Sequence, residues 1–338
     1  EVRLKDIQWP FIAKAYQTAY EIFSKRVKRR RMSSVEQLVK SHRLSSSTDY
    51  LGFESVDLIV EAIPENMSLK QETFKELEDI VAKDAILATN TSALSITEMA
   101  SGLRHPERFV GMHFFSPVHR MPLVEVIRGD QTSNETVASI VALAKQCGKT
   151  PVVVKNCPGF LVNRILIPYV NEAIYLASEG VSISHIDRLA REFGMPVGPL
   201  ELADEVGLDV GYKVSKILEE GYGDRMSLPP VFKIISDNEM PLKGKKSGEG
   251  FYKYSGKQKV ESSQMKQWLS QHHTSRTISD EECVDRLILI MVNEAARCLE
   301  ESIVESPGHL DMAMIMGCGF PPFRGGLWAY VLDETIDK

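Results

Sequence analysis

Residues 56–89, VDLIVEAIPENMSLKQETFKELEDIVAKDAILAT, decide the fold class of this chain. Residues 56–63 form an apolar run with the length of a buried strand, and residues 85–89 form a second run of the same kind. Between them Phe74, Leu77 and Val81 recur at steps of three and four, which predicts a helix over residues 69–81. A strand, a helix and another strand in this order indicate an α/β domain with a parallel sheet.

The same alternation extends in both directions along the chain. Upstream, residues 2–7 alternate apolar and polar side chains as a strand does, and Pro10 then suits the first turn of a helix. The apolar positions of that helix are Ile12, Tyr16, Ala19, Phe23 and Val27. Downstream, the sequence predicts strands over residues 109–115, 123–127 and 152–155, and a helix over residues 135–147. We therefore assign residues 1–157 to one α/β domain.

After Pro158-Gly159 the pattern of the chain is almost wholly helical. A helix is predicted over residues 161–178, and glycine-rich turns at 221–223 and 244–250 interrupt the later helices. Residues 256–278 are polar and have the composition of a linker. The sequence thus predicts an all-α domain at 158–255, a linker at 256–278 and a second all-α block at 279–338.

The second helical block is similar to part of the first. Asn171-Glu172-Ala173 recurs 122 positions later as Asn293-Glu294-Ala295, and His185-Ile186-Asp187 recurs 124 positions later as His309-Leu310-Asp311. Gly194-Met195-Pro196-Val197-Gly198-Pro199 is echoed by Gly319-Phe320-Pro321-Pro322. Because similar segments occur in the same order, duplication is favoured over chance, and we expect two related all-α domains.

Composition excludes several classes of protein. The chain has 40 Lys and Arg residues against 46 Asp and Glu, a net charge of −6, which argues against a general nucleic-acid binder. Its five cysteines include no CxxC pair and no metal-ligand spacing, so free thiols in a reducing compartment are favoured over disulfides or a metal site. No apolar stretch is long enough to span a bilayer, and the charged residues 1–5 are unlike a signal peptide. We expect a soluble, intracellular protein.

Two of the predicted strands each carry one ionisable residue, His113 and Glu125, among apolar neighbours. A carboxylate and an imidazole that face each other from adjacent strands fix the tautomer of the imidazole and raise its basicity. Such a pair suits a general base that removes a proton from an alcohol. The alternative is a His–Glu pair that only stabilises the fold, and the sequence leaves both open.

A polar run, residues 90–95, follows the strand predicted at 85–89. It reads as a loop at the carboxyl end of a strand, where open α/β sheets bind their ligands. Alternatively, Ser92 or Ser95 caps the next helix without contacting a ligand.

Three further features also have two interpretations each. Asn163 enters an otherwise apolar helix, where its amide either caps local backbone groups or hydrogen-bonds a substrate oxygen. Asp6 stands where a dinucleotide-binding fold places the acid for the adenosine ribose, although a cap is the commoner role for such a residue. The basic run, residues 25–31, is either a solvated helix end or a site for a phosphorylated ligand.

Taken together, these motifs resemble the L-3-hydroxyacyl-CoA dehydrogenase family. The segments that match in order and spacing are Asn90-Thr91-Ser92, His113-Phe114-Phe115-Ser116-Pro117, Leu123-Val124-Glu125-Val126-Ile127 and Pro158-Gly159-Phe160-Leu161-Val162-Asn163-Arg164. The resemblance continues through residues 194–199 and 248–252 and covers residues 1–255. The second helical block resembles the multifunctional branch of fatty acid β-oxidation enzymes, in which an enoyl-CoA hydratase domain precedes this region.

The resemblance implies a function and a set of roles. The activity implied is oxidation of L-3-hydroxyacyl-CoA to 3-ketoacyl-CoA with NAD, in fatty acid β-oxidation. His113 is then the base and Glu125 its orienting partner, while Ser92 and Asn163 hold the substrate oxygen. The NAD site implied comprises Asp6, Glu65, Lys70, Asn90, Ser92, Ser116 and Lys246, and the coenzyme A site comprises Lys25, Lys28, Arg29 and Arg30. A thiolase subunit is an implied partner, and the bacterial cytoplasm is favoured as location over peroxisomes or mitochondria.

The chain departs from the family in two respects. Ser116 stands where many members have asparagine. The first strand of the Rossmann-like domain and its G-x-G-x-x-G turn do not appear, so we expect a sheet without a central strand and weakened NAD binding. Two rivals are a non-catalytic CoA-thioester-binding or assembly module and an NADP dehydrogenase of the 6-phosphogluconate kind. The set His113, Glu125, Ser92 and Asn163 argues against the first, and the acid at position 6 argues against the second.

Overall fold

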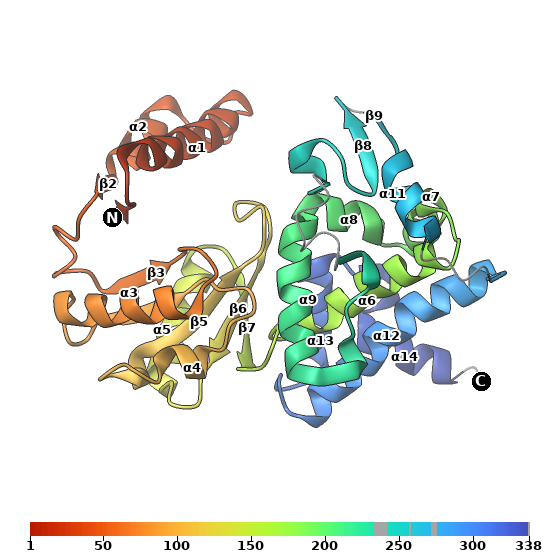
Figure 1. The fold of residues 1–338 in the computed structure, drawn as a ribbon. Coiled ribbons are helices and arrows are strands. Elements are labelled where there is room, and N and C mark those ends of the chain that lie inside the picture. Colours follow the sequence, from red (N-terminus) through yellow and green to blue (C-terminus); the bar gives the residue numbers. More distant parts are fainter. Residues whose placement is uncertain (233–241, 257, 272–275, 337–338) are drawn as a thin grey trace.

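The computed structural model describes residues 1–232, 242–256, 258–271 and 276–336. A part built around a β-sheet lies beside a helical part, and the chain passes from the first to the second between β7 (Thr150–Lys155) and α6 (Val162–Ser178) (Figure 1).

The central sheet has five strands in the order β3, β4, β5, β6, β7. Their bounds are β3 (Leu58–Glu61), β4 (Ile86–Thr89), β5 (Phe109–Phe114), β6 (Leu123–Arg128) and β7 (Thr150–Lys155). Each strand overlaps a predicted one, which confirms an α/β domain. The first three strands pair in parallel, whereas β6 runs antiparallel to β5 and parallel to β7.

Strand alternation gives the two faces of this sheet different neighbours. On one face, side chains of β5 and β6 pack against α5 (Asn134–Gln146) through Val110, Met112, Val124, Val126, Ile140 and Ala144. On the other face, Phe109, Leu123 and Ile127 join the core shared with the helical part. Since His113 and Glu125 have the same parity as these three residues, they also belong to the face toward the helical part.

Two helices pack into the core on the face of the sheet that carries Phe109. The first is α3 (Met67–Ile80), which begins where the Asn66 side chain accepts a hydrogen bond from the Leu69 amide. The second is the short helix α4 (Ile96–Ala100). Phe74 of α3 meets Phe109 of β5 edge to face, with ring centroids 4.7 Å apart, which fixes α3 against the sheet.

The first 47 residues form a separate unit. Its elements are β1 (Val2–Lys5), α1 (Trp9–Lys28), α2 (Ser34–His42) and β2 (Leu44–Ser47). Strands β1 and β2 pair in parallel as a two-stranded sheet that is distinct from the five-stranded one. The strands of the α/β domain are therefore divided between two sheets.

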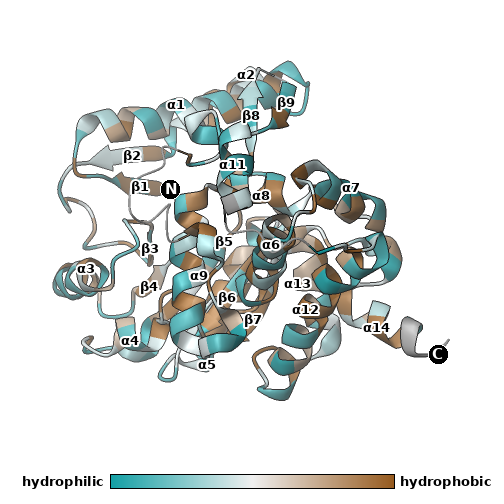
Figure 2. Cartoon of the chain, turned by 45° about the vertical axis from the view of Figure 1, so that its right-hand side comes forward, coloured by the Kyte–Doolittle hydropathy of each residue, from teal (hydrophilic) through white to brown (hydrophobic). Residues whose placement is uncertain are grey.

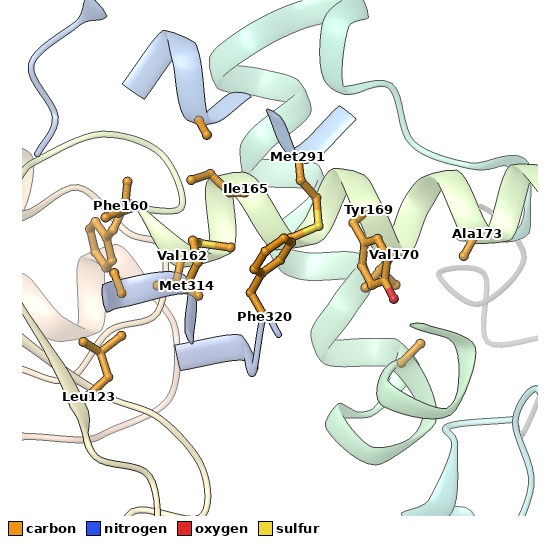
Figure 3. Packing of buried hydrophobic residues seen from close by; sticks show 14 of the residues in the cluster. Leu123, Phe160, Val162, Ile165, Tyr169, Val170, Ala173, Met291, Met314 and Phe320 are labelled. Atoms are coloured by element: carbon orange, nitrogen blue, oxygen red, sulfur yellow. The ribbon is translucent and has the colours of Figure 1, made fainter. Parts of the chain in front are cut away.

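The helical part is arranged around α6 (Val162–Ser178), which is buried along most of its length. This part also contains α7 (Ile183–Phe193), α8 (Pro199–Val206), α9 (Leu208–Tyr222), α12 (Asp280–Glu300), α13 (Pro307–Cys318) and α14 (Leu327–Ile336). Figure 3 shows Tyr169 of α6 close to Met291 and Phe320, all of them buried. The core of the helical part therefore contains residues from both predicted blocks.

The helix order supports duplication. Ser182 caps α7 and Ser306 caps α13, each by accepting a hydrogen bond from a backbone amide in the first turn. The Asp187 carboxylate accepts from the Leu200 and Glu201 amides at the start of α8. In the same way, the Asp311 carboxylate accepts from the Trp328 and Ala329 amides at the start of α14. The order α6, α7, α8 thus recurs as α12, α13, α14 with the same helix-capping chemistry.

The linker predicted at 256–278 is wrong for residues 258–271. Strand β9 (Gln258–Glu261) pairs with β8 (Tyr252–Ser255), and α11 (Ser263–Gln271) follows. Met265, Trp268 and Leu269 are buried on one side of α11, but the other residues of this segment are mostly polar, so its overall composition does not indicate a helix.

Among the helices of the described residues, none is long and apolar enough to cross a membrane.

Candidate active site

His113 and Glu125 lie directly opposite each other on the antiparallel strands β5 and β6. The His113 Nδ1 atom and the Glu125 Oε2 atom are 2.7 Å apart, and both residues are buried. The antiparallel register is what brings them together, because directly opposed side chains on neighbouring strands lie on the same face.

The second oxygen of Glu125 is held by the start of α6. Its Oε1 atom accepts hydrogen bonds from the Leu161 amide at 3.1 Å and the Val162 amide at 2.9 Å. A carboxylate is favoured there because the first amides of a helix are unpaired and carry positive partial charge. With Glu125 accepting on both oxygens, Nδ1 of His113 is the donor. In the neutral imidazole the single proton is therefore on Nδ1, and Nε2 is the atom that can accept a proton.

Two aromatic rings border the imidazole of His113. The ring centroid of Phe115 is 4.5 Å from that of His113, and the ring centroid of Phe160 is 6.0 Å away. Phe160 is fully buried and has a positive φ of 53° in the turn before α6. These contacts limit the rotation of the imidazole, so its Nε2 atom keeps one direction.

The polar run after β4 lies between β5 and α6. Asn163 of α6 donates a hydrogen bond from its side-chain amide to the Ser92 carbonyl at 2.9 Å. The Asn90 side-chain oxygen accepts from the Phe114 amide at 2.8 Å, at the end of the strand that carries His113. The structure thus links the loop bearing Ser92 to Asn163 and to the strand that carries His113. The capping alternative holds for Ser95, which accepts from the Glu98 amide at the start of α4.

A buried ion cluster supports this loop from β3. Glu65 accepts hydrogen bonds from the Thr91 hydroxyl at 2.6 Å and from the Ser92 amide at 2.9 Å. Burial would raise the pKa of Glu65, but these donors and the nearby Lys70 ammonium outweigh it and lower that pKa. Lys70 is itself buried and donates to Glu61 at 2.7 Å.

Sequence reasoning missed the role of Glu61. This residue ends β3, and its second oxygen accepts from the Thr89 hydroxyl at 2.6 Å at the end of β4. The signal was an acid that follows three apolar residues in a buried strand, since such a charge needs a partner. Lys70 is that partner, nine residues further along the chain.

The remaining predicted site residues lie elsewhere. Asp6 follows β1 and accepts from the Ile7 amide at 2.7 Å, but it does not cap α1, whose N-cap residue is Gln8. Ser116 is exposed after β5 and is joined to Pro117 by a cis peptide bond. Lys246 is paired with Asp209 in the helical part. Among the described residues, no hydrogen bond or ion pair joins any of these three to the His113–Glu125 pair.

The basic run is exposed. Lys25, Lys28, Arg29 and Arg30 lie at the carboxyl end of α1 and just beyond it, and all four are exposed. Figure 2 shows hydrophilic residues along much of α1 and α2. Cations at the carboxyl end of a helix are stabilised by the helix dipole, so the solvated alternative accounts for this geometry without a ligand.

Comparison with known proteins agrees with this arrangement. Residues 1–157 match the NAD binding domain of 3-hydroxyacyl-CoA dehydrogenase, and residues 159–254 match its C-terminal domain. The fatty acid oxidation complex subunit alpha of Psychrobacter arcticus is 43% identical over 99% of this chain, which spans 48% of that relative's length. The chain therefore spans about half the length of the curated relatives it matches.

Two solved structures extend the match to the fold. The 3-hydroxybutyryl-CoA dehydrogenase of Escherichia coli K12 superposes with a TM-score of 0.82 at 26% identity, covering 94% of this chain and 84% of that one. The (S)-3-hydroxybutyryl-CoA dehydrogenase of Ralstonia eutropha is 37% identical with a TM-score of 0.71, covering 75% of this chain and 90% of that one. On these matches and on the His113–Glu125 geometry, the chain belongs to the 3-hydroxyacyl-CoA dehydrogenase family.

Proposed function

We propose that this chain supplies the L-3-hydroxyacyl-CoA dehydrogenase activity of fatty acid β-oxidation and converts L-3-hydroxyacyl-CoA to 3-ketoacyl-CoA with NAD. The observation that carries the proposal is the pair of His113 and Glu125, in which Glu125 is bonded to His113 and to two helix amides at once. A pair held in this way has one tautomer and one orientation, as a general base requires.

His113 removes the proton from the C3 hydroxyl of the substrate through Nε2 in this proposal. Glu125 stabilises the imidazolium that forms, because it already accepts a hydrogen bond from Nδ1. The Ser92 hydroxyl and the Asn163 side chain would hold the reacting oxygen, since both lie on the loop and helix next to the pair. NAD, when bound, supplies the hydride acceptor.

The polar atoms after β1 and β4 fit a dinucleotide. Asp6 uses its Oδ1 atom and Asn90 uses its side-chain oxygen in hydrogen bonds within the protein. Among the described residues, the Oδ2 atom of Asp6 and the side-chain nitrogen of Asn90 have no hydrogen-bond partner, so both are free for a ligand. They follow parallel strands at their carboxyl ends, where such sheets bind dinucleotides. We assign to the NAD side Asp6, Glu65, Lys70, Asn90, Ser92, Ser116 and Lys246. The role of Lys70 is then indirect, because its ammonium is bonded to Glu61.

The proposed substrate is an acyl thioester of coenzyme A. Its phosphates would meet Lys25, Lys28, Arg29 and Arg30, which form an exposed cationic surface. In the whole protein we propose an enoyl-CoA hydratase domain and a thiolase subunit as partners, on the support of the fatty acid oxidation complex relatives. The bacterial origin of these relatives supports a cytoplasmic location over a peroxisomal or mitochondrial one.

The test is formation of NADH from NAD and L-3-hydroxybutyryl-CoA, with His113→Gln as the inactive variant. His105 offers a matched control because it also contacts a glutamate, Glu107 at 3.3 Å, but on the surface. We expect His105→Gln to retain the rate and His113→Gln to lose it. Because weakened NAD binding is expected, the assay is run at saturating NAD. Thioester binding by calorimetry without NADH formation under that condition would contradict the proposal and favour a CoA-binding module.

A further inference from the structure

Helices α6 and α12 carry the same three charged residues at the same spacing. Those of α6 and its end are Arg164, Glu172 and Glu179, and those of α12 and its end, 122 positions later, are Arg286, Glu294 and Glu301. Each arginine reaches across to the acids of the other helix. The two related blocks are therefore joined by two equivalent ionic clusters, one toward each end of the α6–α12 contact.

The two clusters have nearly the same geometry. Arg164 donates to both oxygens of Glu301, at 2.6 and 2.8 Å, and Arg286 donates to both oxygens of Glu179, at 2.6 and 2.9 Å. Glu301 and Glu179 are the residues that end their helices. Each arginine also contacts the second acid of the facing helix, Glu294 or Glu172. Two-oxygen pairing of this kind fixes direction as well as distance.

The clusters differ in what lies next to them. Arg164 belongs to the first turn of α6, directly after Leu161 and Val162, whose amides hold Glu125, and after Asn163. The acids that hold Arg286 are at the other end of α6, about 12 to 22 Å further along the helix at 1.5 Å per residue. Only the Arg164 cluster adjoins the His113–Glu125 pair.

Arg164 has a strict need for its partners. Its side chain is fully buried, and its guanidinium packs on the Tyr222 ring, 4.5 Å from the centroid. The Tyr222 hydroxyl donates to the Pro158 carbonyl at 3.1 Å, in the turn that leads into α6. A buried charge that loses its partner is strongly unfavourable, so the start of α6 is expected to shift when the acids of α12 are removed.

The second block also contacts the sheet near this point. The Lys155 amide at the end of β7 donates to the Ile303 carbonyl at 2.8 Å, two residues after Glu301. A Cβ atom added to Gly317 of α13 would meet Leu123 of β6 at 2.7 Å and Val162 of α6 at 3.1 Å. The segment after α12 is therefore anchored to the sheet that carries Glu125. Glu301, at the end of α12, holds α6 through Arg164, and the amides at the start of α6 bind Glu125.

We propose that Arg164, together with Glu294 and Glu301 of the second block, is a positioning group for the His113–Glu125 pair. By holding the first turn of α6, it keeps the Leu161 and Val162 amides on Glu125 and keeps Asn163 on the Ser92 loop. The second helical block then has a function in the site although none of its residues belongs to the pair. The catalytic meaning of this positioning rests on the proposed dehydrogenase function, whereas the geometry does not.

The test compares Glu301→Ala with Glu179→Ala, which remove equivalent acids from the two clusters. Both side chains are partly exposed, at 45% and 23%, so both variants are expected to fold. The first readout is hydrogen exchange at the Leu161 and Val162 amides. The second is the His113 Nδ1 proton resonance, assigned by its absence in His113→Gln. Neither readout needs substrate or NAD.

We expect Glu301→Ala to accelerate exchange at the two amides on the order of 10-fold, the scale of a hydrogen bond to a charged group. The His113 proton should broaden or shift in the same variant. Glu179→Ala should leave both signals unchanged, although it also removes a two-oxygen ion pair between α6 and α12. Equal effects of the two variants on these signals, or no effect of Glu301→Ala, would overturn the inference.

Turnover separates this inference from the proposed function. If the protein oxidises 3-hydroxyacyl-CoA, kcat should fall on the order of 10-fold in Glu301→Ala and stay near the original value in Glu179→Ala. A protein without turnover but with the contrast in exchange would refute the dehydrogenase function and retain the positioning role. An active protein in which both variants keep full kcat and the same exchange would refute the positioning role alone.

Discussion

Replacing Glu125 by glutamine should reverse one hydrogen bond and thereby inactivate the base. Oε1 of Glu125 accepts from two backbone amides, and Oε2 accepts from Nδ1 of His113. Glutamine satisfies the two amides with its carbonyl oxygen, and its NH2 group then faces His113. Because that group can only donate, Nδ1 must become the acceptor, and the imidazole proton moves to Nε2.

The expected magnitudes differ for rate and for stability. Every partner still has a hydrogen bond in the reversed arrangement, so the free energy of unfolding should change by no more than about 1 kcal/mol. With its proton on Nε2, His113 cannot accept the proton of the alcohol. A wrong tautomer in an otherwise intact site lowers kcat by about 10⁴-fold in a comparable His–carboxylate pair.

The assay is steady-state formation of NADH from L-3-hydroxybutyryl-CoA, run beside urea unfolding. The control is Glu107→Gln, which alters the exposed His105–Glu107 contact and should keep the original rate. A Glu125→Gln enzyme that retains kcat within a few-fold would show that the tautomer argument is wrong. A large loss of stability would show instead that Glu125 serves mainly to hold α6.

Three further outcomes follow from the structure. Burial raises the pKa of Asp204 from its ordinary value of 3.8 to about 6, so between these two pH values the folded protein holds a proton that the unfolded chain has lost. The free energy of unfolding should therefore rise as the pH falls from about 6 toward 4. Urea unfolding of Asp204→Asn should lack this pH dependence. Gly198→Ala should lower the free energy of unfolding by more than about 2 kcal/mol, because the added Cβ atom would lie 2.2 Å from the carboxyl carbon of Asp187. The control is Gly308→Ala, whose Cβ atom would have its nearest neighbour at 4.0 Å, and thermal unfolding should show it to be neutral or stabilising. Replacing Lys28 and Arg29 by glutamine should weaken binding of acetoacetyl-CoA and reduce its dependence on salt, as measured by calorimetry, and unchanged affinity would remove the basic run from the proposed site.

Local patterns predicted much of the α/β domain and of the site. The five strands of the central sheet and the helices α3, α5 and α6 overlap their predictions, because each segment buries one face and its periodicity indicates which face that is. No range was predicted for the short helix α4. The pairing of His113 with Glu125 could also be expected, since each interrupts an apolar strand and a buried charge needs a partner. The echoed segments likewise predicted two blocks with the same helix order.

The linker shows where local reading fails. The apolar residues Met265, Trp268 and Leu269 are few and their neighbours are polar. The polar composition of the segment therefore indicated a linker, although the spacing of these three residues is that of a helix. Lys70 shows the same limit for the site. Its sequence neighbours do not reveal that it is buried against Glu61, and so its ammonium is engaged within the protein.

Local sequence patterns are enough to predict the class of each element, the order of the two helical blocks and the residues available for chemistry, because these depend on periodicity and side-chain type within short segments. Which strands pair depends on contacts across the whole fold. The tertiary structure divides the strands between two sheets, reverses β6 against β5 and so places Glu125 opposite His113. The tertiary structure also pairs Arg164 of α6 with Glu301 at the end of α12, and Arg286 of α12 with Glu179 at the end of α6. Both kinds of contact join separate segments of the chain, and the two ion pairs join residues more than 100 positions apart. A local pattern shows that a strand or a charge needs a partner, but it does not specify which segment supplies that partner.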